Sequence, residues 1–273
     1  MRTARTPGQL RAEVLIVLGV SLGQSAVYSL LALIDKLTQR QALSAQTTTM
    51  NSSVTPDRPW LDLSYQLVNI AFPLVPVVLA FYLLSLDRSV GSARSGPASG
   101  LGTGFLPRTS RPWRLIGFDL RRPLPDLVAG LLIAVGIGIP GLGLYLGARA
   151  LGLNTTVAAS ALTDHWWTVP VLVLAAAENA VLEETIMLGF LFTRFRQLGW
   201  RIGVIIAVSA TIRGSYHLYQ GFGGFVGNLI MGVIFGFLYT RFRRVMPMVV
   251  THTLLDVTAF VGYALVAPYV SWL

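Results

Sequence analysis

Hydrophobic segments of about 20 residues recur along the whole chain, separated by short polar or arginine-containing stretches. A helix needs about 20 apolar residues to cross the ~30 Å hydrocarbon core of a bilayer. Seven segments meet or approach this length, and they cover residues 14–34, 64–86, 126–148, 167–192, 202–219, 222–240 and 246–267. The pattern therefore predicts an all-α fold, a polytopic membrane helix bundle with about seven transmembrane helices.

The composition agrees with a membrane protein and excludes several kinds of chemistry. Of the 273 residues, 53% are hydrophobic and only 12% are charged, about half the charged share of a typical soluble domain. The chain has no cysteine, which excludes thiol catalysis, disulfide bonds and zinc–thiolate sites.

The placement of basic residues predicts the topology. With the N-terminus in the cytoplasm, all but five of the 21 lysines and arginines fall in inner segments; the five are Lys36, Arg40, Arg58, Arg149 and Arg213. This bias predicts a multi-pass protein of a bacterial plasma membrane, with its N-terminus cytoplasmic and its C-terminus outside. The net charge of +9 is then a topology signal that requires no nucleic-acid partner, and the partner to expect is the lipid bilayer.

The density of polar residues divides the chain into two regions. Residues 1–125 contain bland N-terminal anchor spans, the first of them uncleaved, and two polar segments, 37–60 and 87–113, that we expect to be flexible loops. Residues 126–273 hold nearly all polar groups that fall inside predicted spans. We therefore expect the chemistry of the protein in this second region.

Six titratable side chains fall inside the last four predicted spans: Glu178, Glu183, Glu184, His217, His252 and Asp256. A charged side chain at the centre of a membrane helix costs at least ~2.5–3.5 kcal/mol on insertion scales, so such residues are functional candidates. The sequence therefore predicts a buried polar site.

Helical spacing indicates which of these side chains share a face. His252 and Asp256 are four residues apart, as are Asn179 and Glu183, so each pair lies on one side of its helix. Glu183 and Glu184 point about 100° apart and should have different tasks. Asn179 is expected to assist or to be structural.

Two carboxylates and two imidazoles could carry out several kinds of chemistry. A glutamate beside a histidine can deprotonate water for attack on a carbonyl, and a second histidine with an acid can stabilise the oxyanion. Glu183, His217 and His252 could also bind a divalent metal such as zinc. The H-E-x-x-H and G-x-S-x-G motifs are absent. A transporter or proton relay, and a haem protein with His217 and His252 as axial ligands, are alternatives.

Three short motifs carry a resemblance to a known family. Residues 183–188 read EETIML, residues 213–217 read RGSYH and residues 252–256 read HTLLD. Over residues 165–260 the chain resembles the CPBP family of intramembrane proteases, the CAAX-prenyl-protease type 2 and bacteriocin-processing group. Its pattern is E-E-x-x-x-R, then F-x-x-x-H, then H-x-x-x-N or D, on successive spans.

The resemblance implies an intramembrane endopeptidase with residues 126–273 as its catalytic core and a membrane-associated peptide or protein as its substrate. Matching positions make Glu183 the residue that activates water with His217, and His252 with Asp256 the oxyanion-stabilising pair. Glu184 becomes an assisting or structural acid. The resemblance favours glutamate-activated water with no required cofactor, while a divalent metal is possible. A non-catalytic member acting as a scaffold or immunity protein is the alternative.

Two positions depart from the family pattern. Leu188 stands where the family has arginine, and Arg213 stands where it has phenylalanine. An unpaired glutamate and an unpaired arginine in one bundle would each be costly. We therefore expect Arg213 to pair with Glu184 in place of an arginine at position 188. We also expect the helix to tilt, to break near residues 213–215 or to start before Arg201, because Glu183 and His217 otherwise lie at different depths.

Overall fold

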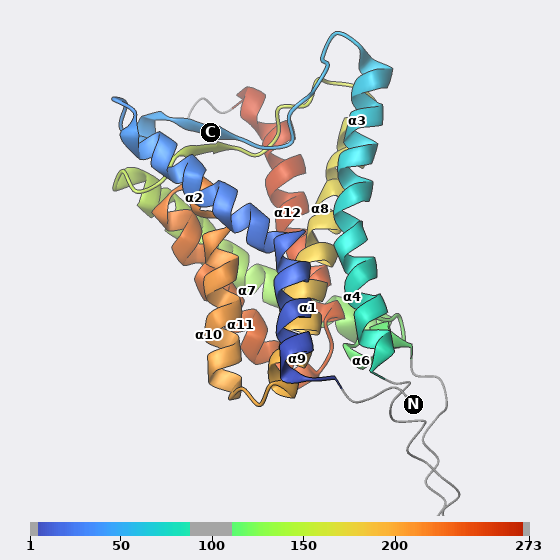
Figure 1. Cartoon of the computed structure of the whole chain (residues 1–273). Helices are drawn as coiled ribbons and strands as arrows, with labels where there is room; N and C mark the ends of the chain where they lie inside the picture. The colour runs from blue at the N-terminus through green and yellow to red at the C-terminus, as the bar shows by residue number, and fades with distance from the viewer. Residues whose placement is uncertain (1–4, 88–110, 270–273) are drawn as a thin grey trace, which may run out of the picture.

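A computed structural model describes residues 5–87 and 111–269 and is a bundle of helices (Figure 1). The α-helices are α1 Pro7–Gly19, α2 Leu22–Thr38, α3 Pro59–Ala71, α4 Val75–Leu86, α6 Pro112–Leu115, α7 Pro123–Ala150, α8 Thr168–Glu184, α9 Leu191–Gln197, α10 Ile202–Ser215, α11 Phe222–Phe242 and α12 Met246–Val266. Short 3-10 turns lie at Leu43–Ala45, Phe72–Leu74, Leu218–Gln220 and Ala267–Tyr269, and a π-helix covers Thr185–Phe190. The predicted helical membrane fold is confirmed.

Several helices begin where the sequence provides a start signal. Proline stands in the first turn of α1, α3, α7 and α12, where the amide hydrogen that it lacks would have no partner within the helix. In α1 the Thr6 hydroxyl also accepts from the backbone of Gln9, whose side chain accepts in return from the backbone of Thr6. This reciprocal cap fixes the start of the first helix.

Four helical stretches among the described residues are long and apolar enough to cross a membrane: Pro59–Leu86, Pro123–Ala150, Phe222–Phe242 and Met246–Val266. The pair α1 and α2, bent by 51°, would make a fifth. The predicted fifth segment is the 14-residue α10, about 21 Å long at 1.5 Å per residue. Each predicted segment thus consists mainly of helix, while the count of seven spans stays a prediction.

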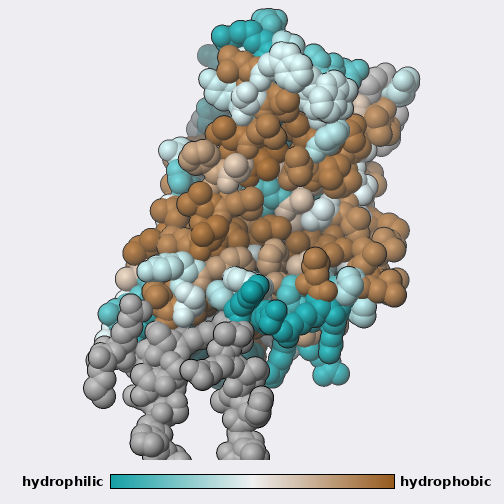
Figure 2. All heavy atoms as spheres, turned by 90° about the vertical axis from the view of Figure 1, so that its right-hand side faces the viewer, coloured by the Kyte–Doolittle hydropathy of each residue, from teal (hydrophilic) through white to brown (hydrophobic). Residues whose placement is uncertain are grey.

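The outer surface of the bundle is apolar around its middle. Figure 2 shows a belt of hydrophobic side chains between two ends that are richer in hydrophilic ones. On α7, Leu132 and Ile139 are 69% and 71% exposed. In an aqueous protein such side chains would be buried, because removing apolar surface from water is favourable. Lipid is the environment that matches this surface, so the belt indicates an integral membrane protein.

The N-terminal helices pack into the same core as the rest of the chain. Val17 of α1 and Leu84 of α4 are buried together with Phe190 of the π-helix and Phe235 of α11. Residues 1–125 therefore help to hold the helices of the second region in place, while the functional division at residue 125 remains a prediction.

The predicted flexible loop at 37–60 is ordered, which corrects that expectation. It contains β1, Thr47–Thr49, which pairs in parallel with β2, Thr156–Ala158, in a two-stranded sheet. The sheet lies at the end of the molecule away from the N-terminus (Figure 1). The backbone of this loop thus finds hydrogen-bond partners over 100 residues away, a pairing that its polar composition does not reveal. Of the other predicted loop, 87–113, residues 88–110 lie outside the described residues.

Buried ion pairs tie the helices together near the N-terminal end. From the sequence we expected Arg194 to be a loop charge, but its side chain in α9 is fully buried. It bonds Asp87 at 2.5 Å and Glu13 at 2.8 Å, and Glu13 also pairs with Arg5. Arg194 therefore links α9 to α1 and to the end of α4.

A second cluster at this end is formed by Arg244, whose guanidinium bonds Asp126 at 2.6 Å and Asp119 at 3.1 Å. Burial tends to raise the pKa of Asp119, but hydrogen bonds from the Arg121 backbone and from Arg244 outweigh it and leave the pKa below its ordinary value. The resulting contribution to stability is present at neutral pH and is lost as the pH falls through the lowered pKa.

Replacing Arg194 should destabilise the bundle strongly. Arg194→Gln leaves Glu13 and Asp87 close together without their buried cation, and breaking such a pair costs about 3–5 kcal/mol. We expect a clear drop in the thermal unfolding midpoint of the purified protein in detergent. The exposed Arg201 provides the control, since Arg201→Gln should leave the midpoint within about 1 °C of wild type, because surface substitutions cost little. Equal midpoints for the two variants would contradict the assigned role of Arg194.

Candidate functional site

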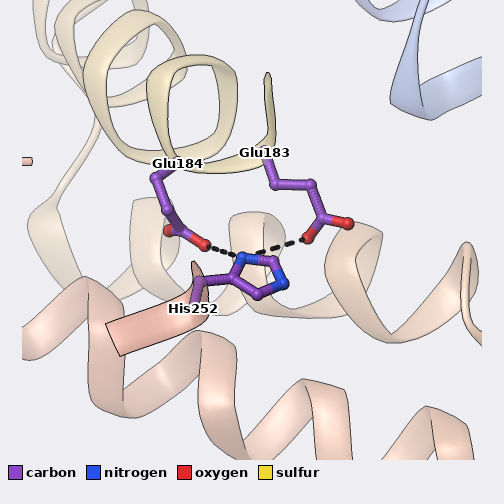
Figure 3. A group of neighbouring side chains, drawn as sticks. All are labelled: Glu183, Glu184 and His252. Atoms are coloured by element: carbon purple, nitrogen blue, oxygen red, sulfur yellow. Dashed lines mark hydrogen bonds and ion pairs between the residues drawn. The ribbon is translucent and has the colours of Figure 1, made fainter. Parts of the chain in front are cut away.

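Glu183 and Glu184 are the last two residues of α8, and the π-helix begins at the next residue. Both side chains are buried. π-Helical segments are rare and occur often at functional sites, because they change the direction in which neighbouring side chains point. In Figure 3 the two glutamates leave the same helix and converge on the ring of His252 from α12.

Glu184 is the centre of a buried ion cluster. Its Oε1 accepts from Arg213 Nη2 of α10 at 2.7 Å and from His252 Nδ1 at 2.8 Å (Figure 3 shows the second of these). The expected pairing of Arg213 with Glu184 is therefore present. The guanidinium of Arg213 also lies 5.3 Å from the centre of the Phe235 ring, a cation–π contact. Three helices are thus joined through one carboxylate.

Glu183 has a different set of partners, as expected from its different direction. The hydroxyl of Tyr216 donates to its Oε2 at 2.6 Å. The same oxygen lies 3.3 Å from Arg213 Nη1 and 4.0 Å from His252 Nδ1. Its other oxygen, Oε1, accepts no hydrogen bond from the residues that the structure describes. Glu183 therefore keeps one oxygen available for a further donor.

His217 follows α10, which ends at Ser215, so among the expected alternatives the structure shows a helix that ends near residues 213–215. Its Nδ1 lies 3.0 Å from the backbone oxygen of Arg213. A hydrogen on Nδ1 donates to that oxygen and leaves Nε2 as the basic nitrogen. Within the described segments, no hydrogen bond joins His217 directly to Glu183, although the two side chains interact electrostatically.

The turn after His217 depends on Gly221, which has a φ of +113°. A Cβ atom there would lie 2.6 Å from the carbonyl oxygen of Leu153, so both the backbone angle and the close approach require glycine. A hydrogen bond from β1 also fixes the turn, because the hydroxyl of Thr48 donates to the backbone oxygen of Tyr219. The small sheet thus covers the turn that carries His217.

His252 and Asp256 share one face of α12, as their spacing predicted. His252 Nε2 lies 3.6 Å from Asp256 Oδ2, and Asn179 of α8 donates to the same oxygen at 3.5 Å. This contact between Asn179 and Asp256 therefore joins α8 to α12. Glu178 is buried as well, and its Oε1 has no hydrogen-bond partner among the described residues.

The group that could hold a metal ion differs from the one expected. Ligand atoms of Glu183, Glu184 and His252 lie within 4.8 Å of one another, while His217 stands outside this group. The guanidinium of Arg213 already contacts both carboxylates. A divalent cation would have to share this space with a fixed positive charge, so the donor set fits a metal poorly.

A groove of about 640 Å³ opens on the surface of the bundle and reaches Tyr216 beside this cluster. Its wall on α2 carries the polar side chains Gln24, Ser25 and Ser29, and the facing wall includes Pro73 in the break between α3 and α4. Tyr216, the hydrogen-bond donor to Glu183, lines the groove. The groove therefore connects the surface of the bundle with the partner of Glu183.

Tyr216 is the site residue that sequence reasoning missed. A tyrosine near the end of an apolar segment gives no signal, because tyrosine is common in membrane helices and at their ends. Its position directly before His217 is the one hint that the sequence contains.

Comparison with known families agrees with this geometry. Residues 165–258 match the model of a family described as type II CAAX prenyl endopeptidase Rce1-like. The matched segment begins just before α8 and ends within α12, so it includes the glutamates and both histidines of the cluster. No curated protein and no solved structure matched the chain. This match confirms the family expected from three short motifs: residues 165–258 are similar to the Rce1-like family, which is a peptidase family.

Proposed function

We propose that this protein is an intramembrane endopeptidase in which Glu183 and His217 activate a water molecule for attack on a peptide bond. The observation that carries the proposal is the unequal treatment of two adjacent buried glutamates. Each glutamate keeps one oxygen without a hydrogen-bond partner among the described residues, but the side chain of Glu184 is fully buried against Arg213 and His252, whereas that of Glu183 is 10% exposed. A base needs a free oxygen that a water molecule can reach.

In the first step a water donates one hydrogen to Glu183 Oε1 and is oriented by Nε2 of His217. As the water oxygen attacks the carbonyl carbon, its proton passes to the glutamate, and a C–O bond forms while the carbonyl becomes an oxyanion. The proton later passes to the leaving amine as the C–N bond breaks. The hydrogen bond from Tyr216 and the nearby Arg213 hold the carboxylate in position for this transfer.

In this proposal His252 stabilises the oxyanion. Its Nδ1 donates to Glu184, and Asp256 lies 3.6 Å from its Nε2. Two flanking carboxylates complement a ring that carries hydrogens on both nitrogens, and the Nε2 hydrogen, which makes no hydrogen bond to Asp256 at 3.6 Å, can be donated to the oxyanion. In a dry site a pre-oriented donor of this kind contributes far more than in water.

Arg213 supports a mechanism without a required metal. The guanidinium supplies a fixed positive charge at 2.7 Å from Glu184 and 3.3 Å from Glu183. This is the charge that the family arginine, replaced by Leu188, would otherwise provide. Haem ligation is disfavoured, because His252 is already engaged by Glu184 and lies beside Asp256.

The groove beside α2 is the proposed route for the substrate. Its polar side chains lie on α2, whose other exposed side chains include the apolar Val27, Leu30 and Leu31. Serine and glutamine side chains can bond the backbone of an unwound peptide, whose amides would be costly to leave unpaired in lipid. We therefore propose a membrane-associated peptide or protein substrate.

Removing the base should abolish cleavage. Glu183→Gln and His217→Ala should each lower the rate by about 10²–10⁴-fold, the usual contribution of general base catalysis. The measurement compares N-terminal fragments of total membrane proteins from cells that produce each variant. Glu178→Gln is the matched control and should retain the fragments. If the same fragments persist in Glu183→Gln, the proposed reaction is wrong.

Chelators should leave activity unchanged. Since Arg213 supplies the positive charge beside both glutamates, incubation with EDTA followed by its removal should preserve the fragment pattern, and added zinc should produce no gain. Loss of cleavage on chelation and its recovery with zinc would instead establish a metal at Glu183, Glu184 and His252.

Replacing Arg213 should separate the role of its charge from that of its size. Arg213→Leu leaves two buried carboxylates with only His252 nearby and should cost about 3–5 kcal/mol of stability. Arg213→Lys keeps the charge and should be the milder change. Thermal unfolding in detergent measures both variants, and a leucine variant as stable as wild type would refute the charge-compensation idea.

A further inference from the structure

Acidic side chains near the N-terminal end of the bundle are already paired. Glu13 and Asp87 are held by Arg194 and Arg5, while Asp119 and Asp126 are held by Arg244. These four carboxylates therefore already have arginine partners, and the described residues at this end offer no further carboxylate to neutralise another arginine.

Two exposed arginines at this end have no such partner. Arg196 lies in α9 and Arg243 follows the end of α11, and neither forms an ion pair within the part of the chain that the structure describes. Although they are far apart in sequence, both line one small cleft between α6, α9 and α11. The cleft therefore carries an uncompensated positive charge.

The cleft, of about 190 Å³, has the donors that a phosphate group needs. Two guanidinium groups are the preferred partners of phosphate oxygens, because their planar N–H pairs match the oxygen geometry. Tyr239 lines the same cleft, and its ring is fixed edge-on against Phe192 at 5.3 Å. Its hydroxyl makes no hydrogen bond to another described residue and can donate to a ligand.

Exposed apolar side chains on the helices that form the cleft indicate where such a phosphate comes from. Leu115 of α6 lines the cleft and is 51% exposed, and Phe237, which lies on α11 outside the cleft lining, is 61% exposed. These side chains suit acyl chains, whereas a free phosphate ion or a nucleotide would make no use of them. Basic pockets between helices at the membrane surface bind anionic headgroups in this way.

We propose that Arg196, Arg243 and Tyr239 bind the phosphate of an anionic phospholipid from the leaflet at this end of the molecule. The lipid headgroup occupies the cleft and its acyl chains lie along the apolar belt. The site joins α9, which follows the two glutamates through the π-helix, to α6 and to the end of α11. This inference is independent of the peptidase reaction.

The test uses the full-length protein with phosphatidylglycerol as the anionic probe and phosphatidylcholine as the neutral one. Native mass spectrometry should detect retained phosphatidylglycerol on wild type, and added phosphatidylglycerol should raise the thermal unfolding midpoint in detergent. The double variant Arg196→Gln/Arg243→Gln should bind this lipid at least 10-fold more weakly. Tyr239→Phe should show a smaller loss.

The matched control is Arg11→Gln/Arg201→Gln, which removes the same charge at exposed positions outside the cleft. It should retain phosphatidylglycerol as wild type does, with the same rise in midpoint. Equal binding by the two double variants would overturn the proposal, since attraction would then depend on net charge alone. Equal protection of wild type by inorganic phosphate would overturn the lipid assignment, because the cleft would then recognise a free anion.

Discussion

Two adjacent carboxylates buried inside an apolar bundle require hydrogen-bond donors or positive charges beside them, since an unpaired charge in lipid costs several kcal/mol. Arg213 and His252 provide these partners for Glu184, with contacts of 2.7 and 2.8 Å. These contacts come from three different helices, α8, α10 and α12, so satisfying the charge also fixes how the helices sit against one another. In a medium of low dielectric constant such pairs are strong and directional.

Arg213 serves the site through its backbone as well as its side chain. The guanidinium contacts both glutamates, while the carbonyl oxygen receives His217 Nδ1. The last turn of α10 thereby places the charge that neutralises Glu184 and sets the orientation of the histidine in a single rigid unit. Tyr216, between them in sequence, bonds Glu183. Because α10 ends at Ser215, Arg213, Tyr216 and His217 can all face the site. In a continuous helix these three side chains would point in different directions.

Sequence reasoning identified the helical segments and the polar cluster because both leave strong local signals. Long apolar runs and rare buried charges such as Glu184 and Asp256 stand out against their surroundings. The pairing of Arg213 with Glu184 was also predictable, since each charge required a partner. Arg194 was not, because an arginine beside a span end reads as a loop charge until Glu13 and Asp87 are placed around it. The strand at 47–49 likewise could not be predicted, because its partner strand at 156–158 is more than 100 residues away and nothing near residues 47–49 indicates that pairing.

That strand pairing also bears on the order in which the protein can be assembled. Thr47 pairs with Thr156. The small sheet covers the turn after His217 only once Thr48 forms its hydrogen bond to Tyr219. The ribosome must therefore deliver the second half of the chain before the loop that follows α2 can find its place. Contacts so distant in sequence form late, because the entropy of closing the intervening chain opposes them. During synthesis the polar loop at 37–60 remains without its partners while the helices insert, and the closing of this end of the molecule becomes one of the last events of folding.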